Sequence, residues 1–406
     1  MKHSSASPSK AHRFMKCPGS LAFTESLPES RTEGLSRKDA YMGTVAHLVL
    51  QTSLEDARSP ANLLDRYAGI MADGSAEWVT DCTEAYAKVV RVDDKMIEAV
   101  IVAYDYARAR AKDIGAEIET ESLTNPIPAR DDTPGIADVS LLSPIVLEAV
   151  DYKNGRMVVE TKGNPQLLAY LLGKAIEAKW QPSVFFITII QPNAYHKDGP
   201  VRRVEVSIQE LLAFEEEYGL SLDKVDRARD EFSLGDLDVW ADNWLAAGDH
   251  CLWCKARGVC AVSAEETLKQ IRLDFDDHVT EEGCFDDVAA ALSTYKHADK
   301  IRAHLNAAES YLEKALIDGA EVPVYYLRES GSTRIWTPRI PSHQLLSSLL
   351  ASNYFDERVR EKLRLGWPMS GPQAEKLVKP SLRAFFSGDF LYKPAGKLKI
   401  AKKDED

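Results

Sequence analysis

The chain has 406 residues, of which 45% are hydrophobic and 28% charged, a composition typical of a globular protein long enough for two domains. Its apolar runs, such as "VFFITII" at 184–190, are much shorter than the roughly 20 residues of a membrane-spanning helix, so no membrane association is expected. The net charge of -13 excludes a protein that binds polyanions over its whole surface, because nonspecific DNA affinity comes from basic side chains.

The first residues, "MKHSSASPSKAHRF", are basic and polar and lack the apolar core of a secretory signal, so a cytoplasmic location is expected. Six cysteines are too few for a disulfide scaffold in a chain of this length. Three of them are clustered as C-x2-C-x5-C in "HCLWCKARGVC" at 250–260, which favours a metal site.

In chain order, apolar residues at helical spacing predict helices over 43–55, with Thr44 as N-cap, and over 80–112, ending near Gly115. Alternating patterns then predict strands over 116–123, 135–143 and 145–153, the last two joined as a hairpin. A helix over 165–180 follows Asn164, its predicted cap. Further strands (183–192 and 201–207) and an acidic helix to about Phe232 complete a predicted α/β fold, a mixed sheet flanked by helices.

From residue 264 onward the patterns predict a separate C-terminal α+β appendage. It has a helix over 298–321 and a small hairpin formed by 324–330 and 333–338. Its end, 376–403, is rich in Lys and Arg with aromatic residues between them, which suits a local DNA contact or a solvated basic tail equally well.

Two carboxylates in the predicted hairpin suggest a divalent metal site. Asp138 lies within one strand and Asp151 near the end of the next, where pairing would bring them together. Lys153 shares a strand face with Asp151 and could stabilise charge that develops on a phosphodiester. Such carboxylates suit Mg2+ or Mn2+, but a D-x-K pattern alone also fits strand-end residues that pair with their neighbouring lysine.

Four motifs occur in a fixed order: Gly43-x-x-x-His47, Gly135-x-x-Asp138, Asp151-x-Lys153 and Gln166-x-x-x-Tyr170. Singly, a helix histidine is more often packed than a ligand, and Gln166 and Tyr170 could simply pack at an interface. Together they resemble the motifs of the RecB-like branch of the PD-(D/E)XK nuclease superfamily over residues 12–262. The phrases "VDYKNG", "NPQLLAYLLG" and "IIQPN" are also similar to a group of phage and prophage RecB-like proteins described as a domain of unknown function.

This resemblance implies a PD-(D/E)XK restriction-endonuclease-like fold for residues 1–263. It implies metal ligation by His47, Asp138, Asp151 and the Tyr152 carbonyl, with Lys153 as the catalytic lysine. Gln166 and Tyr170 would orient the site and contact DNA. Glu121, on the preceding strand, is a further carboxylate candidate that we do not include in the predicted site.

The C-x2-C-x5-C loop needs a fourth ligand to close a site. Cys17 in "KCPG" has a basic neighbour, whereas Cys82 and Cys284 have acidic neighbours that disfavour a thiolate. In the AddB and CRISPR-adaptation types of RecB-like nuclease, one cysteine before the motifs and three after them hold a [4Fe-4S] cluster. The resemblance therefore implies a structural cluster on Cys17, Cys251, Cys254 and Cys260, with Zn2+ as the competing occupant and His250 as an alternative zinc ligand.

The resulting hypothesis is a metal-dependent DNA nuclease, an exonuclease that acts on DNA ends in phage recombination or replication, by hydrolysis with a metal-activated water. A phage recombinase or a single-strand-binding protein would be its partner. The alternatives are a non-catalytic DNA-binding or assembly module that retains the nuclease fold, and a zinc-stabilised protein-interaction domain.

Overall fold

The computed structural model describes residues 4–27, 37–71, 73–79, 86, 88–233, 235–276, 298–322, 325–329, 335–336, 348–364, 371–378, 382–392 and 398–402. The chain divides into two compact units, Met1–Ala307 and Ala308–Asp406. The boundary that we predict for the nuclease domain, residue 263, falls inside the first unit. None of the described helices combines the length and the apolar character needed to cross a membrane.

A five-stranded mixed sheet forms the centre of the first unit, with the strand order β4-β5-β6-β7-β8. Its strands are β4 (Glu117–Thr124), β5 (Gly135–Leu142), β6 (Val146–Tyr152), β7 (Val184–Ile190) and β8 (Val201–Val206). Neighbouring strands run antiparallel except β6 and β7, which are parallel and pair from Val146↔Val184 to Tyr152↔Ile190. The predicted α/β class with a mixed sheet is therefore confirmed.

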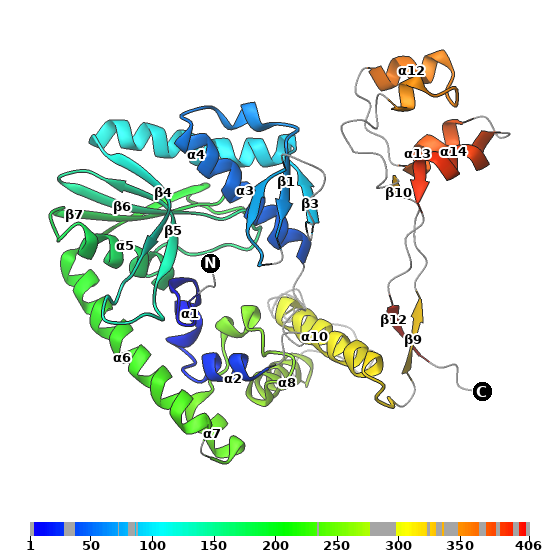
Figure 1. Ribbon diagram of the computed structural model, residues 1–406. Coiled ribbons are helices and arrows are strands. Elements are labelled where there is room, and N and C mark those ends of the chain that lie inside the picture. The colour runs from blue at the N-terminus through cyan, green and yellow to red at the C-terminus, as the bar shows by residue number, and fades with distance from the viewer. Residues whose placement is uncertain are drawn as a thin grey trace. The chain divides into compact units, whose positions relative to one another are not determined.

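Helices cover both faces of this sheet (Figure 1). The helices α5 (Pro165–Glu177) and α6 (Ile208–Phe232) pack on one face, together with the N-terminal residues Ala11 and Phe14. On the other face lie α3 (Arg37–Glu55) and α4 (Asp94–Ile114). Each face thus has its own apolar core, because successive strand residues point to opposite sides of the sheet.

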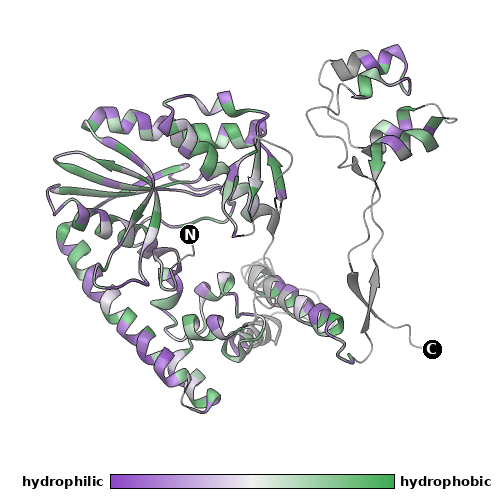
Figure 2. Cartoon of the chain, viewed as in Figure 1, coloured by the Kyte–Doolittle hydropathy of each residue, from purple (hydrophilic) through white to green (hydrophobic). Residues whose placement is uncertain are grey.

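Local sequence signals account for several helix ends. The Asn164 side chain accepts hydrogen bonds from the N–H groups of Gln166 and Leu167, so α5 begins at the predicted cap. Ser207 and Glu210 form a capping box at the start of α6. Gly115 ends α4 in the left-handed conformation, with φ 63°, as predicted. On α6 the buried residues recur at helical spacing, which appears in Figure 2 as alternating hydrophobic and hydrophilic bands.

Two predicted helices begin at other residues than we predict. Thr44 is not an N-cap, because α3 begins at Arg37 and the Thr44 hydroxyl donates to the Ala40 carbonyl within the helix. The helix predicted from residue 80 begins only at Asp94, where the Asp93 side chain caps it. Residues 88–91 instead form β3 of a small antiparallel sheet with the order β2-β1-β3. Their backbone groups pair with those of β1. Its strands are β1 (Tyr67–Ile70), β2 (Ala76–Trp78) and β3 (Lys88–Arg91).

The other described elements between residues 4 and 276 are mostly short. They are η1 (Pro8–Lys10), α1 (Ala11–Phe14), α2 (Ser20–Ser26), η3 (Pro60–Leu63), α7 (Leu237–Trp244), η4 (Asp249–Trp253) and α8 (Ala261–Asp276). The N-terminal turn contacts the segment after α7, where the Gly19 N–H donates to the Trp244 carbonyl at 2.9 Å. Trp240 packs against Phe23 and Phe232 beside this contact. The two ends of the predicted nuclease domain therefore meet.

The C-terminal region contains α10 (Ala298–Ile317), α12 (Glu357–Arg364), α13 (Gly371–Leu377), α14 (Arg383–Phe390), β9 (Tyr325–Glu329), β10 (Ile335–Trp336), β11 (Leu391–Tyr392) and β12 (Leu398–Lys402). The hairpin that we predict between 324–330 and 333–338 is wrong. β9 pairs with β12, and β10 pairs with β11, so each strand takes a distant partner. Part of the basic stretch 376–403, including Lys379, Lys393 and Lys397, lies outside the described residues.

Candidate active site and cysteine pocket

The strands β5 and β6 separate at the end that carries Asp138 and Asp151. Their ladder runs from Leu142↔Leu147 to Val139↔Val150 and stops there. Beyond it, the Tyr152 N–H donates to Asp138 Oδ2 at 2.8 Å. A carboxylate thus takes the place of a backbone carbonyl, which satisfies the N–H and fixes the orientation of the Asp138 side chain.

The strand pair β4–β5 is distorted at the same point. Its ladder is regular on both sides of Glu121 and Asp138 but is interrupted at this pair. Glu121 has φ 43°, a left-handed conformation that is unfavourable for a residue with a long side chain. Backbone strain of this kind costs about 1–3 kcal/mol and tends to occur at functional sites.

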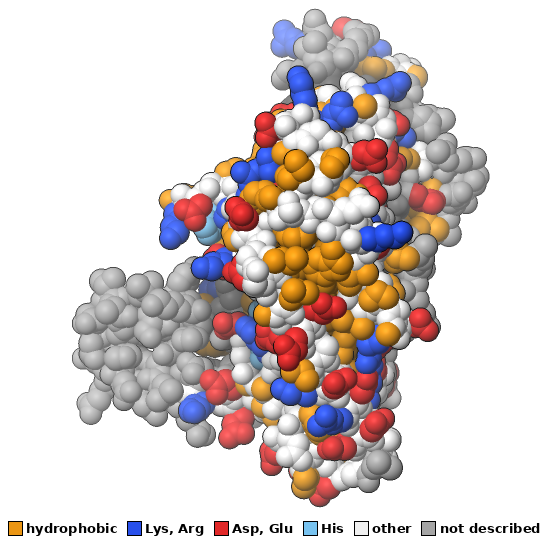
Figure 3. All heavy atoms as spheres, turned by 90° about the vertical axis from the view of Figure 1, so that its left-hand side faces the viewer, with side chains coloured by type: hydrophobic (Ala, Val, Ile, Leu, Met, Phe, Trp, Pro, Cys, Tyr) orange, Lys and Arg blue, Asp and Glu red, His pale blue; other side chains and the backbone are white. Residues whose placement is uncertain are grey.

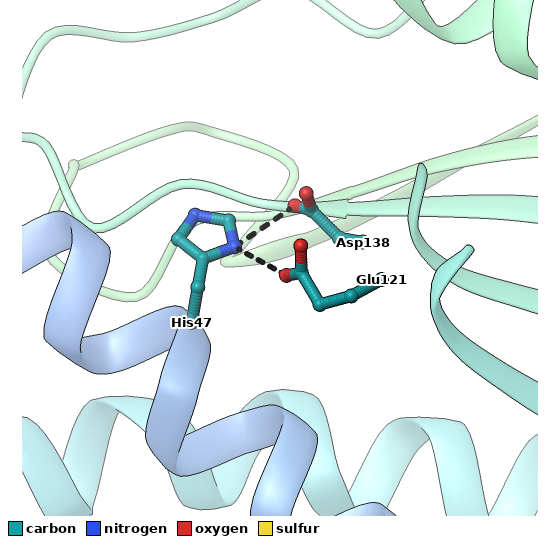
Figure 4. A group of neighbouring side chains, drawn as sticks. All are labelled: His47, Glu121 and Asp138. Carbon is teal, nitrogen blue, oxygen red and sulfur yellow. Dashed lines mark ion pairs between the residues drawn. The ribbon is translucent and has the colours of Figure 1, made fainter. Parts of the chain in front are cut away.

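His47 approaches these carboxylates from α3, as Figure 4 shows. Its Nδ1 lies 3.4 Å from Asp138 Oδ2 and 3.6 Å from Glu121 Oε1. The imidazole also packs edge-on against the Tyr152 ring, with 5.6 Å between centroids. Among the described residues, His47, Glu121 and Asp138 form a group whose ligand atoms all lie within 4.8 Å of one another.

A second group lies beside the first, at the end of β6. Lys153 Nζ donates to Asp151 Oδ1 at 3.0 Å and to Gln166 Oε1 at 3.3 Å. The Gln166 amide donates to Asp151 Oδ1 and to the Tyr170 hydroxyl, each at 3.2 Å. Gln166 and Tyr170, one turn apart on α5, therefore hold Asp151 and Lys153 in place.

Burial and crowded charge change the acidity of these groups. Burial raises the pKa of Asp138, and it raises the pKa of Asp151 to about 6. Burial lowers the pKa of His47, but Asp138 and Glu121 outweigh burial and raise that pKa to about 9. The Lys153 pKa is likewise lowered by burial and raised, on balance, by Asp151 and Asp138. The two aspartates are thus costly to ionise without a cation nearby.

The donor set fits a divalent cation. It offers several carboxylate oxygens, the ligands that suit Mg2+ and Mn2+, and one imidazole nitrogen, a ligand more typical of softer divalent metals. Asp151 Oδ2 is a buried oxygen that accepts no hydrogen bond of good geometry, although Lys153 Nζ lies 3.0 Å away. An unsatisfied buried oxygen of this kind is suited to ligation.

The fold brings the residues of the predicted site together. They form two neighbouring groups that the chain from Asp151 to Lys153 joins: His47, Asp138 and Tyr152 in one, and Asp151, Lys153, Gln166 and Tyr170 in the other. Asp151 is not in the group of ligand atoms that lie within 4.8 Å of one another. Tyr152 contributes its N–H and its ring to these contacts. Glu121 is the residue that the sequence prediction left out, since only its acidic side chain on the neighbouring strand pointed to it.

The four predicted cluster cysteines line one pocket, which also includes Arg13 and His250. The Ala246 N–H points at Cys17 Sγ at 3.4 Å, although these residues are 229 positions apart. Burial raises the pKa of Cys254 and Cys260. Burial also acts on Cys251, but the His250 side chain outweighs it and lowers the Cys251 pKa. Cys82 and Cys284 lie outside the described residues.

The sulfur atoms in this pocket are not tightly grouped. In the described part of the chain, the sets of donor atoms within 4.8 Å of one another include no three of these cysteines. His250 is 4% exposed, and its Nε2 lies 2.8 Å from the Ala246 carbonyl, to which it donates. Its Nδ1 is buried without a hydrogen-bond partner. The pocket therefore holds four thiols and one unsatisfied imidazole nitrogen.

One face of the molecule carries charged side chains of both signs. Figure 3 shows acidic and basic side chains mixed over one face, with an apolar band across its middle. Exposed apolar residues of the first unit include Leu212 and Leu220 on α6. Any polyanion contact on this face would have to be local.

A family model described as "Protein of unknown function (DUF2800)" matches residues 3–406. Among solved structures, the chain is similar to an alkaline exonuclease (LHK-Exo) from Laribacter hongkongensis. The sequence identity is 13%, the TM-score is 0.22, and the match covers 32% of this chain and 68% of that one.

Proposed function

This chain belongs to the DUF2800 family, and we propose that it is a metal-dependent DNA nuclease of the RecB-like PD-(D/E)XK type. One observation carries the proposal. His47, Glu121 and Asp138 converge from α3, β4 and β5, directly beside the ion pair of Asp151 and Lys153 on β6. A cation held by this group could activate a water, and the neighbouring lysine could stabilise the charge that develops during phosphodiester hydrolysis.

Each residue has a role in the proposed reaction. His47, Glu121, Asp138, Asp151 and the Tyr152 carbonyl would hold Mg2+ or Mn2+. The cation would lower the pKa of the attacking water and polarise the phosphodiester. Lys153 stabilises the negative charge that develops on the phosphate oxygens. Gln166 and Tyr170 keep Lys153 and Asp151 in position.

A cleavage assay with end-labelled DNA tests this function. Wild type and Lys153→Ala are compared on single- and double-stranded DNA with Mn2+, and Lys162→Ala, which removes an exposed lysine nearby, serves as the control. We expect Lys153→Ala to reduce cleavage by about 100-fold or more, as loss of a charge-stabilising group does. Cleavage that is equal in wild type and Lys153→Ala would contradict the proposal.

We also propose that the enzyme is an exonuclease on DNA ends, with phage recombination or replication as its setting and a recombinase or single-strand-binding protein as its partner. The resemblance of "VDYKNG" and "NPQLLAYLLG" to phage RecB-like proteins supports this setting. Release of mononucleotides from the labelled end would support exonuclease action. Internal fragments would indicate an endonuclease instead.

The second candidate is a non-catalytic DNA-binding or assembly module with the same fold. The acidic net charge of -13 favours the assembly role in particular, because negative charge lowers the nonspecific affinity for DNA. The same assay separates the two functions. DNA retained by the protein without product, with Mg2+ and with Mn2+, would favour the binding module.

For the cysteine pocket we propose a [4Fe-4S] cluster bound by Cys17, Cys251, Cys254 and Cys260. All four line the pocket, which supports a common occupant. Between Zn2+ and a cluster, the resemblance to nucleases with one cysteine before the motifs and three after them favours the cluster. Its role would be to link the N-terminal turn to the segment after α7.

Anaerobic purification distinguishes the two occupants. We expect a brown protein with iron and acid-labile sulfide and with absorbance near 400 nm, roughly where thiolate-to-iron bands lie for cysteine-ligated clusters. A colourless protein with stoichiometric zinc would show that Zn2+, and not a cluster, occupies the pocket.

A further inference from the structure

The loop between β7 and β8, residues 191–200, lies beside the candidate catalytic residues. The strands β6 and β7 are parallel, so their carboxyl ends, which carry Lys153 and Gln191, leave the sheet at the same edge. The Lys153 N–H donates to the Ile190 carbonyl at 2.9 Å. The Asn193 amide donates to the carbonyl of Asn154 at 3.0 Å, and Asn154 directly follows Lys153.

Several hydrogen bonds fix the shape of this loop. The Gln191 amide donates to the carbonyls of Gly155 and Met157, which ties the loop to the segment after Lys153. The Gln191 N–H donates to the Pro200 carbonyl at 2.8 Å, which closes the loop at its base. Gly199 has φ 85°, a conformation that glycine adopts without strain. The backbone is thus held in one conformation next to the site.

Tyr195 projects from this fixed loop into solvent. Its side chain is 92% exposed, whereas the preceding residue, Ala194, is buried. Tyr195 lies two positions after Asn193, so their backbones are at most about 7 Å apart. The loops that follow β6 and β7 also carry the exposed side chains of Arg156 and Lys197, and the exposed acids Glu160 and Asp198 lie on them beside His196. The contact between Asn193 and Asn154 therefore anchors a loop with an exposed aromatic ring next to Lys153.

We propose that Tyr195 stacks on a nucleobase of the DNA strand that is cleaved. The proposal rests on the proposed nuclease function. Bases stack on tyrosine through their π-faces whatever their sequence. A base offers its face to such a ring when it is unpaired or when it is the last base at a duplex end. The substrate at this position is therefore a single strand or a DNA end.

Three variants separate stacking from other contacts. Tyr195→Phe keeps the ring, Tyr195→Leu keeps an apolar side chain without a π-face, and Tyr195→Ala removes both. We expect Tyr195→Ala and Tyr195→Leu to raise KM for a single-stranded oligonucleotide by about 5- to 100-fold, the usual effect of losing one base–aromatic stack. Tyr195→Phe should stay within about twofold of wild type, and kcat should change little in all three.

Substrates with a single abasic position identify the base that is stacked. Moving the abasic position along the oligonucleotide should raise KM for wild type at one position and have no effect there on Tyr195→Ala. Suppose that wild type cleaves DNA, and that its KM equals the KM of Tyr195→Ala and of Tyr195→Leu. The stacking role is then wrong and the nuclease function stands. If wild type cleaves no DNA with Mg2+ or Mn2+, both proposals fail.

Discussion

Asp138 Oδ2 accepts a hydrogen bond from the Tyr152 N–H at 2.8 Å, in the position where the β5–β6 ladder would otherwise continue. This contact couples the two strands that carry the candidate aspartates. The contact uses Asp138 Oδ2 and leaves Oδ1 available for another partner. The candidate cation site thus lies where a strand pair ends early, not on an additional loop.

We expect Glu121 to be a metal ligand, although it belongs to none of the four sequence motifs. Glu121→Gln removes one negative charge from the group of His47, Glu121 and Asp138. We expect the Kd for Mn2+ to rise at least about tenfold, which corresponds to about 1.4 kcal/mol. Isothermal titration calorimetry measures this, with Glu117→Gln on the same strand as an exposed control. An unchanged Kd would remove Glu121 from the site.

Metal binding should depend on pH through two groups. Ligation requires an ionised Asp151 and a neutral His47, and their pKa values in the metal-free protein are about 6 and about 9. Affinity for Mn2+ should therefore rise as pH increases toward 9 and fall most steeply below pH 6. Each proton that the metal displaces should change the affinity by about tenfold per pH unit. Titrations at pH 5.5 to 9 in buffers of different ionisation enthalpy would report the protons released. Affinity that is independent of pH over this range would argue against His47 as a ligand.

Gln166 and Tyr170 are expected to act through Lys153 and Asp151. Gln166→Ala removes contacts to both of these residues, whereas Tyr170→Phe removes one contact to Gln166. We expect kcat to fall by about 10- to 100-fold for Gln166→Ala, as for other groups that orient a site, and less for Tyr170→Phe. The Kd for Mn2+ should be nearly unchanged in Tyr170→Phe. The reverse order of effects would indicate that Tyr170 contacts DNA directly.

A network of arginines and aspartates is expected to stabilise the first unit. Asp132 accepts hydrogen bonds from Arg130 and Arg229, and Arg229 also binds Glu25 near the N-terminus. Burial raises the pKa of Asp132, but the two arginines outweigh it and the pKa is lowered from 3.8. This contribution is therefore present above pH 3.8 and is lost as pH falls through the folded-state value.

Asp132→Asn should lower the free energy of unfolding at pH 7 by about 1–2 kcal/mol, given the partial exposure of the side chain. The difference from wild type should shrink in acid. Denaturant titrations measure both effects, and Asp131→Asn, an exposed neighbour, is the control. Equal stability of Asp132→Asn and wild type at pH 7 would show that the network contributes nothing.

Cys17→Ser tests the link between the two ends of the domain. If Cys17 binds the same group as Cys251, Cys254 and Cys260, the variant should lose iron and the absorbance near 400 nm (roughly the cluster band of). Its Tm should fall, because the link closes a very long loop of the unfolded chain. Cys82→Ser, outside the proposed ligand set, should retain both the iron and the Tm. Full iron content in Cys17→Ser would exclude Cys17 as a ligand.

The sequence by itself determined the elements around the site. The alternation in 135–143 and 145–153 and the cap at Asn164 gave correct strands and a correct helix, because those signals are local to a few residues. The order of the four motifs also identified the side chains that the fold brings together. The sequence patterns did not predict the strand β3 or the pairing of β9 and β10. These strands pair with segments elsewhere in the chain, which local patterns do not reveal.

Only the tertiary structure decided how the site is built. The left-handed turn at Glu121, the end of the β5–β6 ladder and the approach of His47 from α3 each depend on contacts between separate elements. The meeting of Cys17 with the segment after α7 is of the same kind. Local patterns reflect the preferences of neighbouring residues, whereas these contacts arise when the two faces of the sheet bury their apolar side chains.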